Sequence, residues 1–247
     1  MAIALASSGS IYSSALATTL DLGNGSSTWA LASATSGNLL VVVCAGALTG
    51  TGLSASSLTK IGGTATLGTI TQDKEGGNTS GSATYVYVYS APITGSGTLQ
   101  LRLADISSSG YMSGACMEFS SADTGASRVA ATNGTGGQDT SAPYEAHSGD
   151  CVSGAAGVFV GVSGWSNAGG GTQAPDAAFT EVHDNYTLYA SAMTIHSGYR
   201  VVTSDTTDEW LTTYSTADPI YEVCCVVYKQ ATGGGGRNPV SMGFDLR

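Results

Sequence analysis

Alternation with a period of two residues, interrupted by glycine-rich turns, is the sequence feature that most restricts the fold of this chain. In segment 98–103, Leu99, Leu101 and Leu103 occupy every second position, and Gln100 and Arg102 lie between them. Successive side chains of a β-strand point to opposite faces, so this segment is predicted to be an antiparallel strand with one buried and one wet face.

The same pattern recurs along the chain. A continuous apolar run at 39–44 predicts a central strand, and segment 84–89 alternates tyrosine with valine. Further candidate strands are predicted at 65–72, 112–120, 155–163, 188–195, 199–203 and 221–229.

Glycine-rich segments at 49–52, 76–78, 94–97, 133–137 and 169–171 are predicted to form the turns between these strands. No window carries an apolar stripe at helical spacing, and the Thr, Val and Gly content opposes helix. Many short strands with such turns predict an all-β fold, an antiparallel two-sheet β-sandwich of the jelly-roll kind over residues 1–231.

Composition narrows the classes of function. Charged residues make up 11% of the chain, and the net charge is −10. An acidic chain without a basic stripe is not expected to bind nucleic acid or an anionic membrane. The longest apolar run is too short to cross a bilayer, and the first six residues lack the positive region of a signal peptide.

The five cysteines are Cys44, Cys116, Cys151, Cys224 and Cys225. Their number is odd, no C-x-x-C motif occurs, and four of them lie in apolar strand-like runs, so we expect reduced core cysteines rather than disulfides. Because adjacent residues of a strand point to opposite faces, at most one of Cys224 and Cys225 is expected to face the core.

A search for chemistry yields no catalytic residues. The three histidines lack metal-ligand spacing, and the segment around Ser163 misses the second glycine of a nucleophile elbow. Glu118 lies inside a predicted strand opposite Met117 and Phe119, which indicates an outer, solvated position. We therefore predict no enzyme activity, no cofactor and no metal; a hydrolase with a His near both a Ser and a carboxylate stays a third hypothesis.

Aromatic residues indicate a candidate binding surface. Tyr85, Tyr87 and Tyr89 share one face of a predicted strand, as do rings that stack on sugars or enter subunit interfaces. Cross-strand packing explains the same pattern. An exposed platform made of these tyrosines, or of Trp165 and Trp210, would favour carbohydrate binding.

A C-terminal arm follows the predicted sandwich at 232–247. Four glycines (233–236) form a flexible tether. The segment beyond them has apolar anchors at strand alternation and a charge of +1, two arginines against Asp245, which leaves −11 on the body; its predicted docking residues are Arg237, Val240, Met242, Phe244, Leu246 and Arg247. A slightly basic strand tethered to an acidic body is typical of a docking arm.

Four segments in order resemble a family of β-sandwich virion accessory proteins of tailed bacteriophages and prophages: Ser36–Val43, Cys116–Thr124, Gly198–Val202 and Glu222–Tyr228. The resemblance spans most of residues 1–231 and implies a capsid decoration, spike or tail protein without catalytic residues. The tethered arm departs from the family pattern.

The resulting expectation is a non-enzymatic structural protein of a bacteriophage virion. It would be a capsid decoration, cement or head-spike protein that self-associates, for example as a trimer, and contacts the major capsid protein. Its location would be the virion, assembled in the host cytoplasm. The alternative is a carbohydrate-binding or host-adhesion module of a phage tail or cell surface.

Overall fold

The computed structural model describes residues 1–8, 12–17, 19–22, 30–48, 58–77, 83–103, 110–138, 142–166, 173–188, 193–215 and 220–232. Across these residues the fold is all-β, and each pair of neighbouring strands is antiparallel. The described part contains no helix with the length and hydrophobicity of a membrane span. The all-β antiparallel prediction is confirmed.

The first half of the chain forms a large sheet and a small one. The large sheet has the order β1-β11-β5-β9-β7, with β2 also on β11 and β8 also on β9, and the small sheet joins β3, β4 and β6 to β10. The strands are β1 (Ala4–Ser8), β2 (Tyr12–Ala17), β3 (Leu20–Leu22), β4 (Leu31–Ala34), β5 (Leu39–Leu48), β6 (Leu58–Gly62), β7 (Thr66–Leu67), β8 (Thr71–Gly77), β9 (Ala83–Gly95), β10 (Gly97–Leu103) and β11 (Gly110–Ser120).

The second half repeats this plan. Its large sheet has the order β12-β21-β15-β18-β17, a small sheet has the order β13-β20-β16, and β14 pairs with β19. The strands are β12 (Val129–Gln138), β13 (Tyr144–His147), β14 (Cys151–Val152), β15 (Gly157–Ser166), β16 (Gln173–Pro175), β17 (Thr180–Leu188), β18 (Met193–Val202), β19 (Thr207–Asp208), β20 (Leu211–Tyr214) and β21 (Ile220–Lys229).

Most strands of one half have a counterpart in the other. In chain order, β5, β8, β9 and β11 of the first large sheet take the places that β15, β17, β18 and β21 take in the second. The small sheets match as well, since β10 pairs with β3, β4 and β6 while β19 and β20 together pair with β13, β14 and β16. The chain therefore builds the same arrangement of strands twice.

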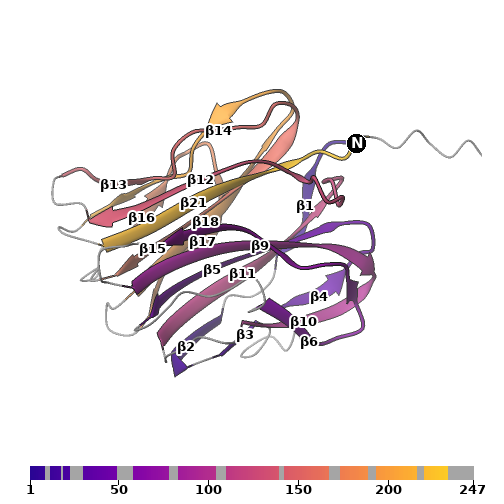
Figure 1. Cartoon of the computed structure of the whole chain (residues 1–247), viewed down its shortest axis with the longest axis horizontal. Helices are drawn as coiled ribbons and strands as arrows, with labels where there is room; N and C mark the ends of the chain where they lie inside the picture. The colour runs from indigo at the N-terminus through magenta and orange to yellow at the C-terminus, as the bar shows by residue number, and fades with distance from the viewer. Residues whose placement is uncertain are drawn as a thin grey trace, which may run out of the picture.

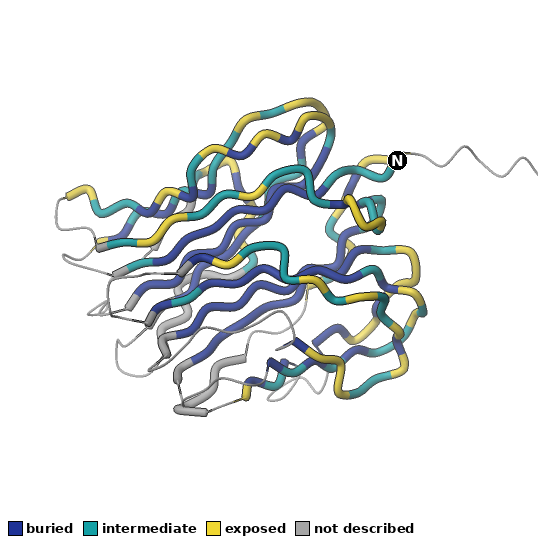
Figure 2. Tube along the Cα trace, in the orientation of Figure 1, coloured by how far each residue is buried: buried dark blue, intermediate teal, exposed yellow. Residues whose placement is uncertain are grey.

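The sheets stack in four layers, with the two large sheets in the middle (Figure 1). Leu39, Val41 and Val43 of β5 face Val158, Val160 and Val162 of β15 in a central core between the halves. Each half also has an outer core, which lies between its large sheet and its small sheets. Burial accordingly concentrates in the strands of the two large sheets (Figure 2).

This stacking corrects the expectation of two sheets. Both faces of the central strands are apolar, so each large sheet is covered on both sides. For the same reason Cys224 and Cys225 are both buried, Cys224 in the central core and Cys225 in the outer core of the second half. The expectation that only one of them faces a core is wrong.

Most predicted strands are present. Two of the predicted segments, 65–72 and 188–195, each cover parts of two separate strands. Segment 65–72 contains β7 and the start of β8, which both pair with β9 and are separated by residues 68–70, where the Gly68 amide donates to the carbonyl of Pro92 on β9. Segment 188–195 contains the end of β17 and the start of β18, two neighbouring antiparallel strands, and residues 189–192 lie outside the described part.

Candidate functional site

The two ends of the stacked sheets are formed by different parts of the chain. At one end, Gln230 follows β21 and donates from Nε2 to the carbonyl oxygen of Met1 over 2.8 Å. A hollow of about 470 Å³ opens here, lined by Met1, Asn38, Ser121 and Ala231 among others. The described part of the chain therefore ends close to residue 1, whose position is marked N in Figure 1.

Strand register defines the opposite end. There Leu48 of β5 pairs with Ala83 of β9 in the first half, and Ile220 of β21 pairs with Gln138 and Ser166 in the second. These strand ends lie together on the left of Figure 1. The body is thus two-ended, with residues 1 and 231 at one end and these ends of β5, β9, β12, β15 and β21 at the other.

The predicted docking residues of the arm, Arg237, Val240, Met242, Phe244, Leu246 and Arg247, lie outside the described residues. The structure describes the chain up to residue 232, so it gives the point where the arm would begin.

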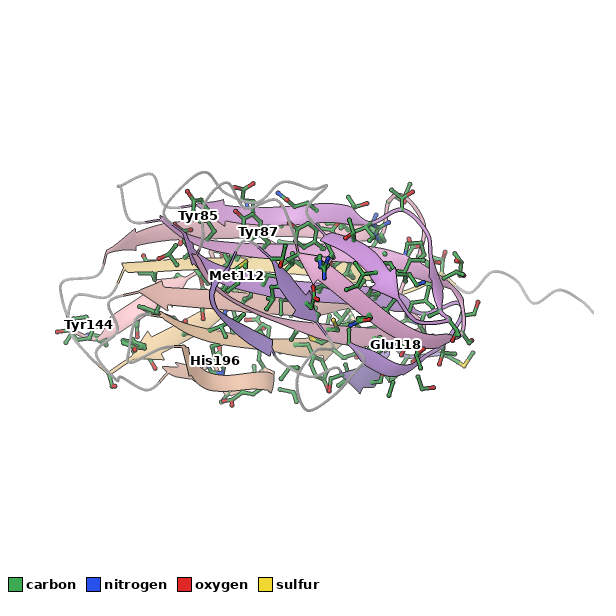
Figure 3. All side chains as sticks on the ribbon, turned by 90° about the horizontal axis from the view of Figure 1, so that it is seen from below. Tyr85, Tyr87, Met112, Glu118, Tyr144 and His196 are labelled. Atoms are coloured by element: carbon green, nitrogen blue, oxygen red, sulfur yellow. The ribbon has the colours of Figure 1, made fainter. Side chains whose placement is uncertain are left out.

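The tyrosines predicted as an aromatic surface lie inside the first half. Tyr87 and Tyr89 are fully buried in its outer core, and Tyr85 is half-buried against the same core. Neighbouring rings along β9 stack with centroids 6.2 Å apart, and Figure 3 shows Tyr85 beside Tyr87. The small sheet around β10 covers them, so the prediction of an exposed platform is wrong for Tyr87 and Tyr89.

The two tryptophans considered for the same role are also fully buried. Trp165 stacks on Tyr214 with a centroid distance of 4.7 Å, and Trp210 meets the rings of Phe179 and His196 edge-on. The residues nominated for sugar stacking therefore serve as packing inside the sheets.

Glu118 is fully buried, and the expectation of an outer position is wrong. Its Oε1 accepts hydrogen bonds from the amide of Thr35 at 2.8 Å and from Asn38 Nδ2 at 2.6 Å, and its Oε2 accepts one from Ser7 Oγ at 2.7 Å. Three donors compensate the burial of this carboxylate. Glu118 therefore ties β1 and the turn between β4 and β5 to β11, near one end of the molecule (Figure 3).

Glu222 is a second buried glutamate, and within the described part of the chain neither of its carboxyl oxygens has a hydrogen-bond partner. It lies on β21 beside the glycines of the neighbouring strands, and a Cβ at Gly136 would approach its Oε1 to 2.1 Å. Burial raises the pKa of this carboxyl to about 8, with Glu75 as a smaller cause. Glycines on either side therefore make room for a side chain that is protonated at neutral pH.

Histidines meet carboxylates at two places. His147 lies between Glu209 and Glu145, with Nδ1 at 3.0 Å and Nε2 at 3.2 Å from their oxygens, and the bond to Glu209 raises the pKa of His147. His196 is buried, with Nε2 at 3.7 Å from Glu181. Among the residues described here, no three His, Cys, Asp or Glu side chains gather as a metal site would require.

A polar network that sequence reasoning missed connects the halves. Arg128 donates from Nε to Ser90 Oγ at 2.7 Å, Ser90 Oγ donates to Asp73 Oδ2, and Tyr228 donates to the same oxygen at 2.7 Å. Burial raises the pKa of Asp73. The one sequence signal for this network is that Arg128 is among only 8 basic residues in the chain.

All five cysteines are free, as the sequence predicted, and all five are buried, including both Cys224 and Cys225. Comparison of this chain with protein-family models, with curated proteins and with solved structures finds no match.

Proposed function

We propose that this chain is a non-enzymatic structural protein of a bacteriophage particle: a capsid decoration, cement or head-spike protein that self-associates on the particle surface. It would be assembled in the host cytoplasm and bind other virion proteins, such as the major capsid protein. The resemblance to that family spans both halves of the body, with two of its four segments in each half.

The family-like segments occupy the interior of the molecule. Residues 38–43 run into β5, residues 116–120 end β11, residues 198–202 end β18, and residues 222–228 fill β21. They contribute to the central and outer cores, so they support a shared scaffold. The proposed role on a phage particle is argued instead from the two ends of the molecule.

The two-ended body is the observation that carries the proposal. The described chain ends at residue 232, close to Met1, where the arm would begin, while the paired ends of β5 and β9 lie at the far side. A module held by its arm at one end would present the other end outward. A tether of four flexible residues spans about 11 Å on average, enough for the arm to reach the adjoining surface of a neighbour.

Internal rigidity suits this role. Three apolar cores run through the stack, and the buried Glu118 and Arg128 fasten separate strands together. A tethered arm raises the effective concentration of a weak contact on a lattice of many copies. The apolar alternation of Val240, Met242, Phe244 and Leu246 is the pattern expected of a strand that adds to a sheet edge.

The test has two measurements. Light scattering coupled to gel filtration compares the full chain with a variant lacking residues 233–247 and with one in which those four apolar residues are changed to serine. We expect the full chain to form oligomers and both variants to have the molar mass of a monomer. A length-preserving control, Arg237→Gln with Arg247→Gln, separates charge from apolar docking.

Particles purified from cultures of the source are then probed with an antibody against the chain by immunogold electron microscopy. Labelled particles are expected. A chain that is monomeric at all concentrations and absent from purified particles would contradict the proposal.

A further inference from the structure

Arg128 is a buried cation held in a fixed position. Only 6% of the residue is exposed. The chain has 18 acidic and 8 basic residues, so a basic side chain is scarce here and one of them is placed in the interior. Its Nε donates to Ser90 Oγ at 2.7 Å, its Nη2 to the Ser90 carbonyl at 3.2 Å, and its Nη1 to the Gly125 carbonyl at 3.3 Å. These three hydrogen bonds, donated to Ser90 and Gly125, orient the planar guanidinium.

Two donors of this guanidinium remain. An arginine side chain carries five N–H groups, and each terminal nitrogen has two. Within the described structure, the three bonds above use one N–H on Nε, one on Nη1 and one on Nη2. One N–H is therefore left on each terminal nitrogen, so Nη1 and Nη2 can each donate once more.

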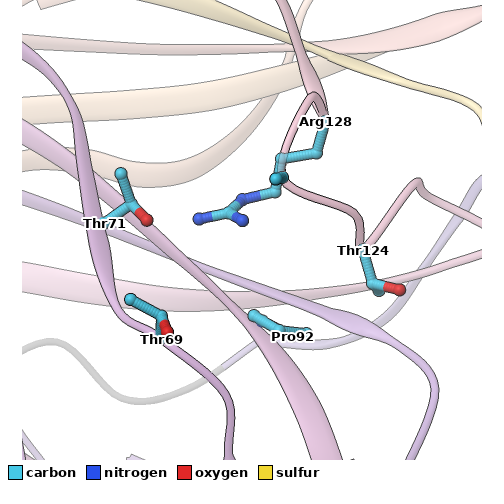
Figure 4. Close-up of a pocket in the computed structure, with 6 residues that line it drawn as sticks. Thr69, Thr71, Pro92, Thr124 and Arg128 are labelled. Carbon is cyan, nitrogen blue, oxygen red and sulfur yellow. The ribbon is translucent and has the colours of Figure 1, made fainter.

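A pocket of about 340 Å³ lies at this point. Thr69, Thr71 and Pro92 come from the first half, and Thr124, Ala126 and Arg128 come from the segment that leads into β12. Figure 4 shows the Arg128 side chain reaching across the pocket toward Thr71. The volume is at the lower end of small-ligand sites, and the lining combines threonines with one charged fork.

The contacts of the Arg128 guanidinium leave it able to bind an anionic acceptor. Ser90 accepts from Arg128 and donates to Asp73, so the guanidinium has no direct ion pair of its own in the described part. Two parallel N–H groups of a guanidinium match the two oxygens of a carboxylate, and such bidentate pairs are among the strong hydrogen bonds of proteins.

We propose that the pocket around Arg128 binds a carboxylate group, held by Nη1 and Nη2 with threonine hydroxyls beside it. The carboxylate belongs either to an acidic side chain of a second copy of this chain or to a free small organic acid. The inference does not rest on the proposed function, because a monomeric chain away from any particle would bind a free acid equally well.

The test is a titration of the ¹⁵N-labelled full chain with propionate at constant ionic strength, followed through the arginine Nε–Hε signals. The Arg128 signal is assigned by its absence from Arg128→Gln. We expect a saturable shift of this signal and of the Thr71 and Thr124 amides. Propionamide, the uncharged analogue, should give none.

Variants locate the site. The amide shifts should be lost in Arg128→Gln and kept in Arg102→Gln, which removes an arginine from the surface ion pair with Asp21. Because Arg128→Gln also breaks structural bonds, Ala126→Trp provides a second route. Ala126 is exposed and lines the pocket, so its enlargement should block binding without disturbing the fold.

The source of the carboxylate follows from sedimentation. If excess propionate or Arg128→Gln dissociates self-associated chains, a neighbouring copy supplies the group; if the mass is unchanged while propionate binds, a free acid does. Shifts that stay linear in propionate, or that persist in Arg128→Gln and Ala126→Trp, would overturn the proposal. Tighter saturation by inorganic phosphate would overturn the assignment to a carboxylate.

Discussion

The hydroxyl of Tyr228 on β21 donates a hydrogen bond over 2.7 Å to Oδ2 of Asp73 on β8, and so joins the second half of the molecule to the first. Ser90 donates to the same oxygen. The two large sheets therefore share a polar contact at the margin of their apolar central core.

Removing this hydroxyl should weaken the fold modestly. Tyr228→Phe leaves the partly buried Asp73 with one donor fewer, and we expect the free energy of unfolding to fall by about 1–2 kcal/mol. Urea denaturation measures the change. Tyr144→Phe is the matched control, because no hydrogen bond of the Tyr144 hydroxyl is described; equal losses in both variants would argue against the inter-half bond.

Replacing Glu118 should have a larger effect. Glu118→Ala removes a buried acceptor and leaves the donors of Ser7, Thr35 and Asn38 without it. We expect a loss of about 3–5 kcal/mol in the free energy of unfolding, against about 1 kcal/mol for Ser7→Ala, which removes one of the three bonds. A loss below that of Ser7→Ala would contradict a structural role for the carboxylate.

Glu222 should make stability depend on pH. Its pKa is about 8 in the folded protein against an ordinary value of 4.5, so between these values the folded state holds a proton that the unfolded chain has released. The free energy of unfolding therefore falls as pH rises from about 4.5 to about 8, and this contribution is constant above that range.

Glu222→Gln removes the dependence. Relative to the natural chain, its free energy of unfolding should rise by about 2–4 kcal/mol between pH 5 and pH 8. Denaturation curves at several pH values measure this, and Asp150→Asn serves as a control at an exposed carboxylate. Parallel pH profiles for the natural chain and Glu222→Gln would show that Glu222 does not titrate in this range.

Gly161 should not tolerate a side chain. A Cβ there would lie 2.2 Å from Cδ2 and 2.3 Å from Cγ of the buried Trp210 side chain. We expect Gly161→Ala to cost about 1–3 kcal/mol by overpacking. Gly137→Ala, where the nearest atom is Tyr221 Oη at 3.4 Å, is the control; thermal melting distinguishes the two, and similar melting temperatures would be the contrary result.

The cysteines should be unreactive in the folded chain. All five are buried, and burial raises the pKa of Cys116 to about 12 and also raises those of Cys44 and Cys224. The pKa of Cys151 is lowered by its hydrogen-bonded neighbour Cys225. Ellman's reagent should therefore find no thiol in the native state and react first with Cys151 when the fold loosens; rapid native labelling would contradict this burial.

The sequence correctly indicated the class of structure. The alternation of Leu99, Leu101 and Leu103 with Gln100 and Arg102 appears in β10 as buried leucines and half-buried polar residues. Such local patterns follow from the two-residue period of a strand, which any window of the sequence records.

The same patterns misplaced Glu118 and the tyrosines. Alternation tells which residues share a face, and it correctly put Glu118 opposite Phe119 and grouped Tyr85, Tyr87 and Tyr89. It does not tell whether that face meets water or another sheet. Because each large sheet is covered on both sides, faces assigned to solvent are interior.

By itself, then, the sequence determined that the chain is β-stranded, rich in turns and acidic, with cysteines suited to a core. Only the tertiary structure decided that the strands form two corresponding halves in four layers, and that Arg128, Ser90, Asp73 and Tyr228 meet between them. The physical reason is range: a strand's periodicity is set by its own backbone, whereas layer order and polar contacts depend on residues that are distant in the chain.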